Sequence, residues 1–143
     1  MLRVRVAALC VHDDRVLLAK HVRGEHVAYL LPGGGVDPDE RLTDALAREL
    51  REEAGVDVDI GAFRYLIEVR GPSGERHLVQ FVFDAVLRGS LGASNDPRVE
   101  ACGWHPVGEL RTLRLRPDTG AELAGDLEAH VSGCRYILAD WRA

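Results

Sequence analysis

Residues 34–56 read GGVDPDERLTDALARELREEAGV and contain the pattern that decides the fold of this chain. Within them, Glu49, Glu52 and Glu53 stand at positions i, i+3 and i+4, which lie on one face of a helix. Like charges at this spacing cost about 0.2–0.5 kcal/mol per pair. Mg²⁺ reverses such a penalty, because it binds carboxylate oxygens together with water and substrate phosphates. The segment therefore predicts an acidic helix face that binds a divalent metal.

The same segment predicts a helix that begins near Leu42 and ends by Ala54. An apolar stripe at helical spacing supports this interpretation, and it consists of Leu42, Ala45, Leu46, Leu50 and Ala54. Gly55 is placed to end the helix just after its last turn. Three glycines at 33–35 precede the helix and allow the backbone to approach a ligand closely.

Nine positions of this segment match a longer signature, G-x5-E-x7-R-E-U-x-E-E-x-G-U, in which U is an aliphatic residue. They are Gly34, Glu40, Arg48, Glu49, Leu50, Glu52, Glu53, Gly55 and Val56. The chain therefore resembles the Nudix hydrolases, whose signature this is. Weaker similarity to the family extends to Leu31-Pro32-Gly33 and to the segment from Trp104 to Leu110, which is similar to a W-x-P-x-x-E-L segment.

Two residues depart from the family pattern near the start of the helix. The position before the first motif glutamate is often glycine and is Asp39 here, and the next position is often a Ser or Thr cap and is Arg41 here. Aspartate tolerates unusual backbone angles, so we expect Asp37 or Asp39 to cap the helix instead. These departures concern the local turn and leave the expected metal site unchanged.

The resemblance implies a single Nudix domain over residues 1–143, an α/β/α sandwich with a mixed β-sheet. It also implies a reaction in which water attacks a phosphorus atom of a pyrophosphate, with Mg²⁺ or Mn²⁺ as cofactor. By resemblance, the metal ligands are Glu49, Glu52 and Glu53 with a backbone carbonyl near Gly33. Arg48 is expected to orient these carboxylates through a pair with Glu40, which is compatible with an ordinary helix salt bridge.

The general base is left open by this resemblance. It is either a motif glutamate, Glu52 or Glu53, or a glutamate from a loop nearer the C-terminus. Glu100 is the best candidate for the second role, although an exposed charge at a strand end is an equally good interpretation. Glu68 and Glu75 are weaker candidates, because the first lies on an expected strand and the second in an expected turn.

Candidate substrate-binding residues are Arg23, His26 and Tyr29, which precede the expected metal loop and could contact a phosphate or a base. His77 and Gln80 lie on a strand that could face the same cleft. For each of these residues, solvent exposure or ordinary strand packing is the more common role.

The composition is typical of a compact enzyme domain. The chain has 143 residues, room for one domain, and a net charge of −5, which disfavours a long nucleic-acid partner. A small nucleotide can still bind, because a divalent metal supplies positive charge. The three cysteines form no C-x-x-C pair and are expected to be free thiols. No signal peptide or membrane span is visible, so we expect a cytoplasmic protein with no membrane partner.

Several further elements are expected from the hydrophobic pattern. Strands are expected at 4–11, 16–19, 29–31, 62–69 and 77–87, with a turn at 13–14, a polar loop at 21–26 and a hairpin turn at 71–74. A loop is expected at 88–97, helices at 107–113 and 119–130, and strand or extended loop at 99–105. Residues 134–139 are expected to form either a last strand or a terminal tail packed on the core.

Three functions fit the motif. The first is a metal-dependent pyrophosphohydrolase acting on ADP-ribose, a sugar nucleotide or a nucleoside tri- or diphosphate. The second is a nucleotide-sensing Nudix module without turnover, which is disfavoured because the chain has no spare length for a DNA-binding segment. The third is an RNA-cap hydrolase, which the acidic charge and the lack of an evident basic channel disfavour. Homodimer formation is left open.

Overall fold

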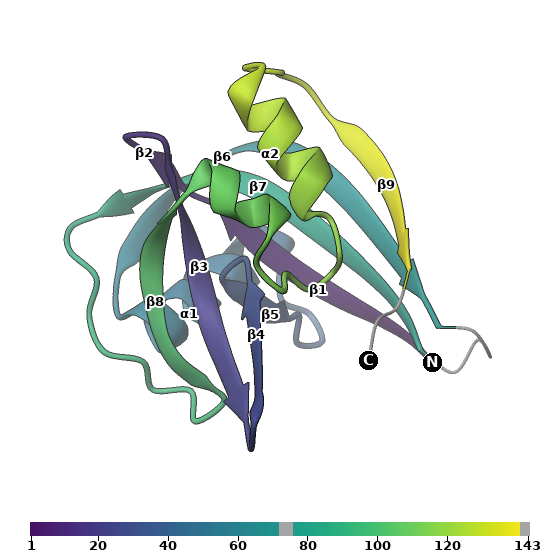
Figure 1. Ribbon diagram of the computed structural model, residues 1–143. Coiled ribbons are helices and arrows are strands. Elements are labelled where there is room, and N and C mark those ends of the chain that lie inside the picture. The colour runs from purple at the N-terminus through teal and green to yellow at the C-terminus, as the bar shows by residue number, and fades with distance from the viewer. Residues whose placement is uncertain (72–75, 141–143) are drawn as a thin grey trace.

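The computed structural model of the protein describes residues 1–71 and 76–140. Figure 1 shows the chain as strands that build two sheets, with helices packed against them. In chain order the strands are β1 (Leu2–Leu9), β2 (Val11–His12), β3 (Arg15–Arg23), β4 (His26–Leu30), β5 (Gly33–Gly35), β6 (Asp57–Arg70), β7 (His77–Arg88), β8 (Val99–Pro106) and β9 (Arg135–Asp140). The helices are α1 (Leu42–Ala54), the 3-10 helix η1 (Val107–Arg111) and α2 (Gly120–Glu128).

The larger sheet has the strand order β5-β1-β7-β6-β9. Its β1–β7 and β6–β9 pairs are parallel, whereas its β5–β1 and β7–β6 pairs are antiparallel. A parallel pair needs a long crossover connection, and the segment between β1 and β7 provides it with α1. The sheet is therefore mixed, as the sequence predicted.

The smaller sheet is built around β3, which pairs antiparallel with β2, β4 and β8. β3 and β4 form a hairpin whose last pair is Arg23 and His26. The prediction of a polar loop at 21–26 is therefore wrong. β3 extends to Arg23 and β4 begins at His26, so only Gly24 and Glu25 lie between the two strands. The polar side chains there are tolerated because this hairpin end is exposed to solvent.

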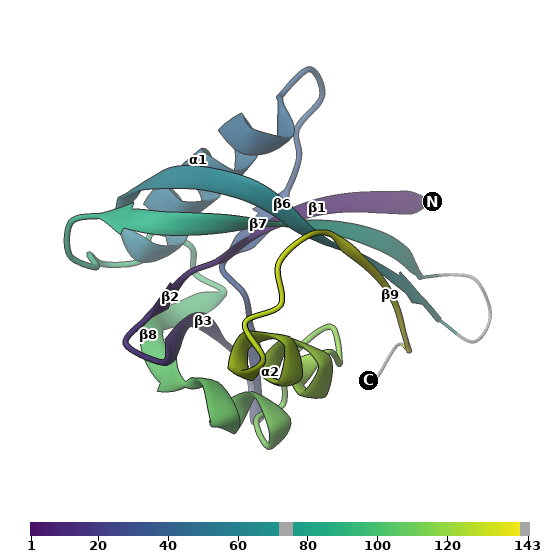
Figure 2. The same cartoon turned by 90° about the horizontal axis from the view of Figure 1, so that it is seen from above.

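Helices α1 and α2 lie on opposite faces of the larger sheet (Figure 2). The alternation of β1 explains this arrangement, because successive residues of a strand point to opposite faces. Val6 and Ala8 pack in the core that contains α1, whereas Ala7 and Leu9 pack in the core that contains α2. This is the predicted α/β/α sandwich.

The motif helix is confirmed at both of its expected ends. Gly55 follows it in the left-handed conformation at φ 58°, and its N–H donates to Arg51 O over 3.1 Å. Asp39 also has a positive φ, 65°, which is the backbone geometry that glycine often supplies at this position. The expected capping by Asp37 or Asp39 is wrong, because the helix begins at an Arg41 cap without a side-chain hydrogen bond.

The C-terminal elements differ slightly from their expected bounds. The helix expected at 107–113 is a short 3-10 turn, and the helix expected at 119–130 is the shorter α2. The segment at 134–139 forms a true strand, which pairs in parallel with β6. Most of the hairpin turn expected at 71–74, together with Glu75, lies outside the described residues. Among the described residues, no helix is long and apolar enough to cross a membrane.

Candidate active site

Three buried carboxylates meet at one end of α1. Glu49 and Glu53 come from the motif helix, and Asp96 comes from the loop that connects β7 to β8. One oxygen of each carboxylate lies within 4.8 Å of an oxygen of each of the others. Glu53 is only 2% exposed, and all three side chains belong to buried residues. Such a group of carboxylates is costly to bury unless a cation compensates their charge.

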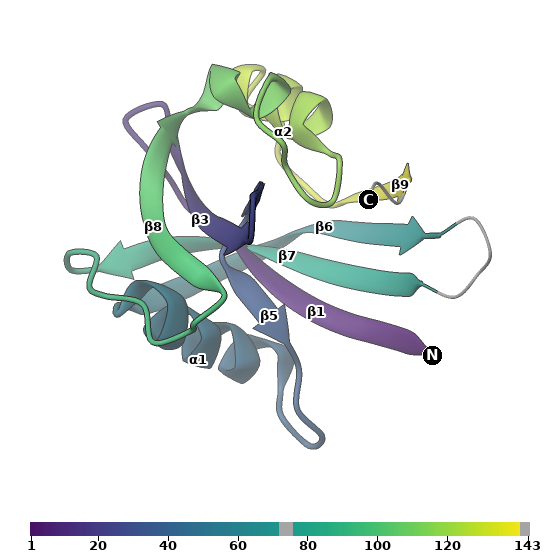
Figure 3. The same ribbon diagram turned by 60° about the horizontal axis from the view of Figure 1, so that its bottom comes forward.

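The loop that carries Asp96 is fastened to the C-terminal turn of α1, beside which it passes in Figure 3. The N–H of Gly92 donates to Ala54 O over 2.7 Å, and the N–H of Asn95 donates to Glu52 O over 2.6 Å. Backbone carbonyls at a helix end lack partners within the helix, so the loop satisfies them. These two bonds fix the position of Asp96 relative to Glu53.

Protein donors satisfy the three carboxylates unequally: Asp96 accepts from Arg98 with both oxygens, whereas Glu49 and Glu53 each accept with one. Glu53 Oε2 accepts a 2.9 Å hydrogen bond from the Gly33 N–H, yet burial raises the pKa of Glu53 to about 8. Burial also raises the pKa of Glu49, against the lowering effect of Arg48. Glu49 Oε2 is buried and has no hydrogen-bond partner among the described residues. An orphaned buried oxygen beside two further carboxylates is the donor set that suits a hard divalent cation.

The surroundings of Gly34 explain why the motif requires a glycine at this position. A Cβ atom built on Gly34 would overlap the carboxyl group of Glu49. The strand β5 therefore approaches the motif helix closely only because this residue has no side chain. At the neighbouring Gly35, a Cβ would meet no atom within 4 Å among the described residues.

Arg48 connects the start of the motif to its carboxylates. Its Nε and Nη2 each donate to the Glu40 carboxylate over 2.9 Å, and its Nη1 donates to Glu49 Oε1 over 2.9 Å. Hydrogen bonds from Arg48 lower the pKa of Glu40 to about 2. Arg48 Nη2 also donates to Gly35 O over 3.0 Å, which ties the helix to β5. The expected Arg48–Glu40 pair is thus present, with the planar fork geometry that arginine favours.

Glu52 lies at the edge of the carboxylate group rather than inside it. Its side chain is 45% exposed, and its carboxylate lies 3.4 Å from Arg48 Nη1. The described carboxylates that approach one another within metal-binding range are Glu49, Glu53 and Asp96, without Glu52. The structure thus brings two of the three predicted glutamates together and leaves the third at the solvent side.

The other carboxylates considered as general bases have partners of their own. Glu100 is 55% exposed at its side chain and forms a 3.3 Å ion pair with Lys20 across the β3–β8 pair. Glu68 accepts hydrogen bonds from Tyr136 and pairs with His77 over 2.6 Å. Neither carboxylate belongs to the buried group.

A cleft of about 750 Å³ opens beside the buried carboxylates. Its lining includes Arg3, Arg5, Arg23, Arg98, Arg111, Arg114 and Arg116. Arg98 of this lining binds Asp96 over 2.8 Å, so the carboxylate group lies next to the cleft, although its three carboxylates are not among the lining residues. The expectation that the chain lacks a basic channel is therefore wrong, because arginines from distant segments gather here despite the acidic net charge.

The predicted substrate-binding residues are distributed unevenly around this cleft. Arg23 and Gln80 line it. Tyr29 instead packs its ring against His105 at a centroid distance of 5.3 Å, and His26 occupies the exposed end of the β3–β4 hairpin. His77 is engaged by Glu68.

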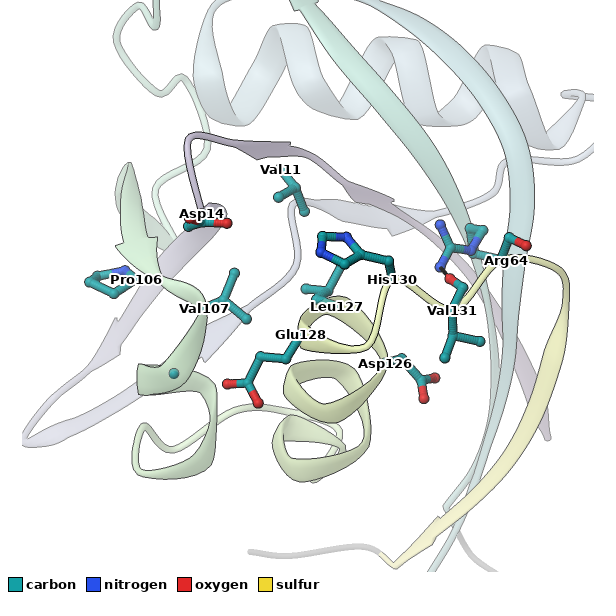
Figure 4. Close-up of a pocket in the computed structure, with 12 residues that line it drawn as sticks. Val11, Asp14, Arg64, Pro106, Val107, Asp126, Leu127, Glu128, His130 and Val131 are labelled. Atoms are coloured by element: carbon teal, nitrogen blue, oxygen red, sulfur yellow. Dashed lines mark hydrogen bonds between the residues drawn. The ribbon is translucent and has the colours of Figure 1, made fainter.

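A second pocket, of about 740 Å³, lies between the β2–β3 turn, η1 and the end of α2 (Figure 4). Its charged groups are largely occupied by protein partners. Arg64 binds Asp84, Asp126 accepts hydrogen bonds from Tyr65 and Arg135, and Glu128 binds Arg111. This pocket has no group of converging carboxylates among the described residues, so it offers no second metal site.

Sequence reasoning missed Asp96 and most of the arginine cleft. Asp96 stands in the run Ser94-Asn95-Asp96-Pro97, which reads as an ordinary loop. Its role depends on contacts of Gly92 and Asn95 with α1, and no spacing in the sequence signals them. The one available signal was the density of arginines at 111–116, where Arg111, Arg114 and Arg116 alternate with apolar residues.

Comparison with known proteins agrees with this geometry. The family model of the NUDIX domain matches residues 1–124. The chain is 36% identical over 134 residues to the nucleoside triphosphatase NudI of Salmonella heidelberg, covering 85% of this chain and 94% of that protein. It is 34% identical over 113 residues to the human 8-oxo-dGDP phosphatase NUDT18, covering 76% of this chain and 33% of that protein. A solved structure of a NUDIX hydrolase from Nitrosomonas europaea superimposes with a TM-score of 0.80 at 22% identity, covering 91% of this chain and 90% of the other.

Proposed function

Because this chain belongs to the Nudix hydrolase family, we propose that it hydrolyses the pyrophosphate bond of a nucleoside tri- or diphosphate with the help of Mg²⁺ or Mn²⁺. Two relatives support this choice of substrate class, since one is named a nucleoside triphosphatase and the other an 8-oxo-dGDP phosphatase. ADP-ribose and sugar nucleotides are the less favoured substrates, because neither of these two relatives is named for them.

The buried carboxylate group is the single observation that carries the proposal. Glu49, Glu53 and Asp96 would hold the cation, with a backbone carbonyl near Gly33 as a further ligand. When bound, the cation supplies positive charge that neutralises the phosphate oxygens of the substrate. The orphaned Glu49 Oε2 and the raised pKa of Glu53, caused by burial, both fit residues that gain a cation as partner.

The remaining residues of the site position the reactants. Arg48 is itself held by Glu40 and Gly35 O and donates to Glu49 Oε1, and so orients a carboxylate that would hold the cation. Glu52 is assigned as the acceptor of the proton from the attacking water, because its half-exposed carboxylate lies outside the buried group. Glu100 stays the alternative base, although its carboxylate pairs with Lys20.

Arg5 and Arg98 would bind the phosphate oxygens that face the cleft. Arg98 donates from Nε and Nη2 to the Asp96 carboxylate over 3.0 and 2.8 Å, so it also orients one member of the carboxylate group. Arg5 donates to Gln80 Oε1 over 3.4 Å from the floor of the cleft. Fixed positive charges near the scissile pyrophosphate lower the activation barrier of hydrolysis, because they stabilise the negative charge that develops on the phosphate oxygens in the transition state.

The whole chain is proposed to act as one domain in the cytoplasm. The segments beyond residue 124, including β9, pair with the larger sheet and share its core. The cysteines Cys10, Cys102 and Cys134 are free thiols, which persist in a reducing compartment.

A panel of nucleotides tests the proposal. The protein would be incubated with Mg²⁺ or Mn²⁺ and nucleoside tri- and diphosphates, ADP-ribose, sugar nucleotides and a capped RNA, the last because of the arginine cleft. Release of phosphate or pyrophosphate from a nucleoside phosphate supports the proposal. Calorimetric binding without any turnover would instead favour the nucleotide-sensing module, and turnover of capped RNA alone would identify a cap hydrolase.

A further inference from the structure

The arginines of the cleft differ in how far their charge is already compensated. Arg111 is engaged on both nitrogens by the Glu128 carboxylate, over 2.6 and 2.7 Å. Arg98 is engaged by Asp96. By contrast, no carboxylate of the described residues lies within ion-pair distance of the Arg23 or Arg116 side chain. Within the described part of the chain, these two guanidinium groups therefore have no carboxylate partner of their own, in a cleft whose lining also includes Asp118 and Asp140.

Arg23 and Arg116 are presented by backbone that is fixed on both sides. Arg23 ends β3, where it pairs with His26 of β4. Arg116 lies in the segment between η1 and α2, which passes beside β4 in Figure 1. The N–H of Arg116 donates to Tyr29 O over 2.8 Å, and the N–H of Tyr29 donates to Arg114 O over 2.9 Å. Strand β4 thus connects the two arginines.

The two arginines line the cleft that lies next to the buried carboxylates, to which Arg98 connects it. Arg23, Arg116, Arg5 and Arg98 all line it, together with His21. The pKa of His21 is lowered by burial and by the nearby charges of Arg5, Arg98 and Arg116, whereas Asp96 raises it. Asp96 and Arg116 thus both act on His21, which lines the cleft together with Arg116.

The described lining of the cleft offers a nucleobase only the His21 imidazole as an aromatic stacking partner. Among the described residues that line it, none is Phe, Tyr or Trp. Stacking on an aromatic ring contributes about 1–3 kcal/mol per base where it occurs. In this cleft, affinity has to come mainly from phosphate charge, for which arginine provides fork-shaped donors.

We propose that Arg23 and Arg116 are specificity-determining residues that bind the phosphate by which a nucleoside triphosphate exceeds a diphosphate. The proposal rests on the proposed function, in which the scissile pyrophosphate aligns with the carboxylate group next to the cleft. The additional phosphate of the triphosphate then extends toward these two arginines. The protein consequently prefers triphosphates to diphosphates of the same nucleoside and discriminates little between bases.

The test compares kcat/KM for dGTP and dGDP with Mg²⁺. We expect the wild-type protein to prefer dGTP by about tenfold or more, equivalent to about 1.4 kcal/mol. Arg23→Gln and Arg116→Gln should each lower this ratio several-fold, and the double variant should bring it close to one. The loss should appear in KM for dGTP, with kcat and the constants for dGDP little changed. Arg116→Lys should restore part of the preference, because it keeps the charge.

Arg15→Gln is the matched control, since Arg15 lies at the opposite end of β3 and does not line the cleft. Its dGTP to dGDP ratio should equal that of the wild type. A wild-type preference for dGDP, or an unchanged ratio in the double variant, would overturn the inference.

Failure of the proposed function has a separate signature. The same variants would be titrated calorimetrically with dGTP and dGDP in the presence of Ca²⁺. If the wild type turns over no nucleoside phosphate of the full panel, the proposed function fails, and the dissociation constants decide the inference. A binding preference for dGTP that is lost in the double variant supports the two-arginine site, and equal affinities in all variants contradict it.

Discussion

The N–H of Gly33 donates a 2.9 Å hydrogen bond to Glu53 Oε2, joining the strand β5 to the last turn of the motif helix. The bond orients a carboxylate that is almost fully buried and whose pKa burial raises to about 8. The Gly33 N–H thus orients the Glu53 carboxylate but does not compensate its negative charge. This relationship makes Glu53 the most informative residue for testing the site.

Glu53→Gln should reduce turnover by at least two orders of magnitude while the fold stays intact. The amide keeps the volume and can still accept the Gly33 hydrogen bond, but it removes one charge from the carboxylate group. Steady-state rates with Mg²⁺ and circular dichroism of the same sample check the two halves of this prediction. A rate within threefold of the wild type would show that Glu53 does not serve the metal.

Glu52→Gln should also lower kcat by orders of magnitude, but with metal affinity largely retained. This outcome follows from the position of Glu52 at the solvent edge, where it is assigned to accept a proton. Turnover rates at saturating Mn²⁺ report on the role of Glu52 as proton acceptor, and direct titration with Mn²⁺ reports on whether it is a metal ligand. A large loss of Mn²⁺ affinity would instead identify Glu52 as a ligand.

The metal-free protein should lose stability as pH rises from about 4.5 to about 8. In the unfolded chain Glu53 titrates near 4.5, whereas burial keeps its proton bound in the folded protein up to about pH 8. The unfolded state therefore binds fewer protons across this window, and the free energy of unfolding falls by an amount on the order of 5 kcal/mol at most. Thermal melts in chelator across pH check this. The melting temperature should depend less on pH in Glu53→Gln, and also in the wild type after addition of Mg²⁺. A melting temperature of the wild type in chelator that does not change with pH would contradict the raised pKa of Glu53.

Gly34→Ala should reduce activity far more than Gly35→Ala, although both add one methyl group to the same strand. The new Cβ at 34 would overlap the Glu49 carboxyl group and displace it, whereas at 35 it meets no described atom within 4 Å. Turnover of the two variants, with melting temperatures as a check of folding, measures the difference. An equal loss of activity in both variants would mean that β5 tolerates no added methyl group at either position, and that the contact of residue 34 with Glu49 is not the cause.

Asp96→Asn and Glu100→Gln distinguish the two carboxylates near the start of β8. Asp96 belongs to the buried group, whereas Glu100 pairs with Lys20 at the surface. We expect Asp96→Asn to lower turnover about 10- to 100-fold, and Glu100→Gln to stay near the wild-type rate. A strong loss in Glu100→Gln alone would return the role of base to Glu100.

The sequence predicted the local parts of this molecule well. The bounds of α1, its Gly55 end and the Arg48–Glu40 pair follow from spacing along one segment, because helical neighbours are three or four residues apart. The β3–β4 hairpin was misjudged because polar residues at an exposed strand end resemble a loop. The pattern of residues along the chain was therefore enough to predict contacts between residues that are close in sequence.

The rest of the site depends on contacts between distant segments. Asp96 reaches Glu49 only because its loop is fastened to the end of α1, 40 residues earlier in the chain. The arginine cleft collects Arg3, Arg23, Arg98 and Arg116 from separate elements, so the net charge of −5 gave no indication of it. Such juxtapositions are set by the topology of the sheet and not by any periodicity.

Titration of Mn²⁺ into the chelator-treated protein, followed by electron paramagnetic resonance, tests the central claim most directly. The claim is that Glu49, Glu53 and Asp96 form a divalent-metal site. We predict saturable binding to the wild type and at least a tenfold weaker affinity in both Glu53→Gln and Asp96→Asn, with Glu100→Gln unchanged. Equal Mn²⁺ affinity in the wild type, Glu53→Gln and Asp96→Asn would contradict the account.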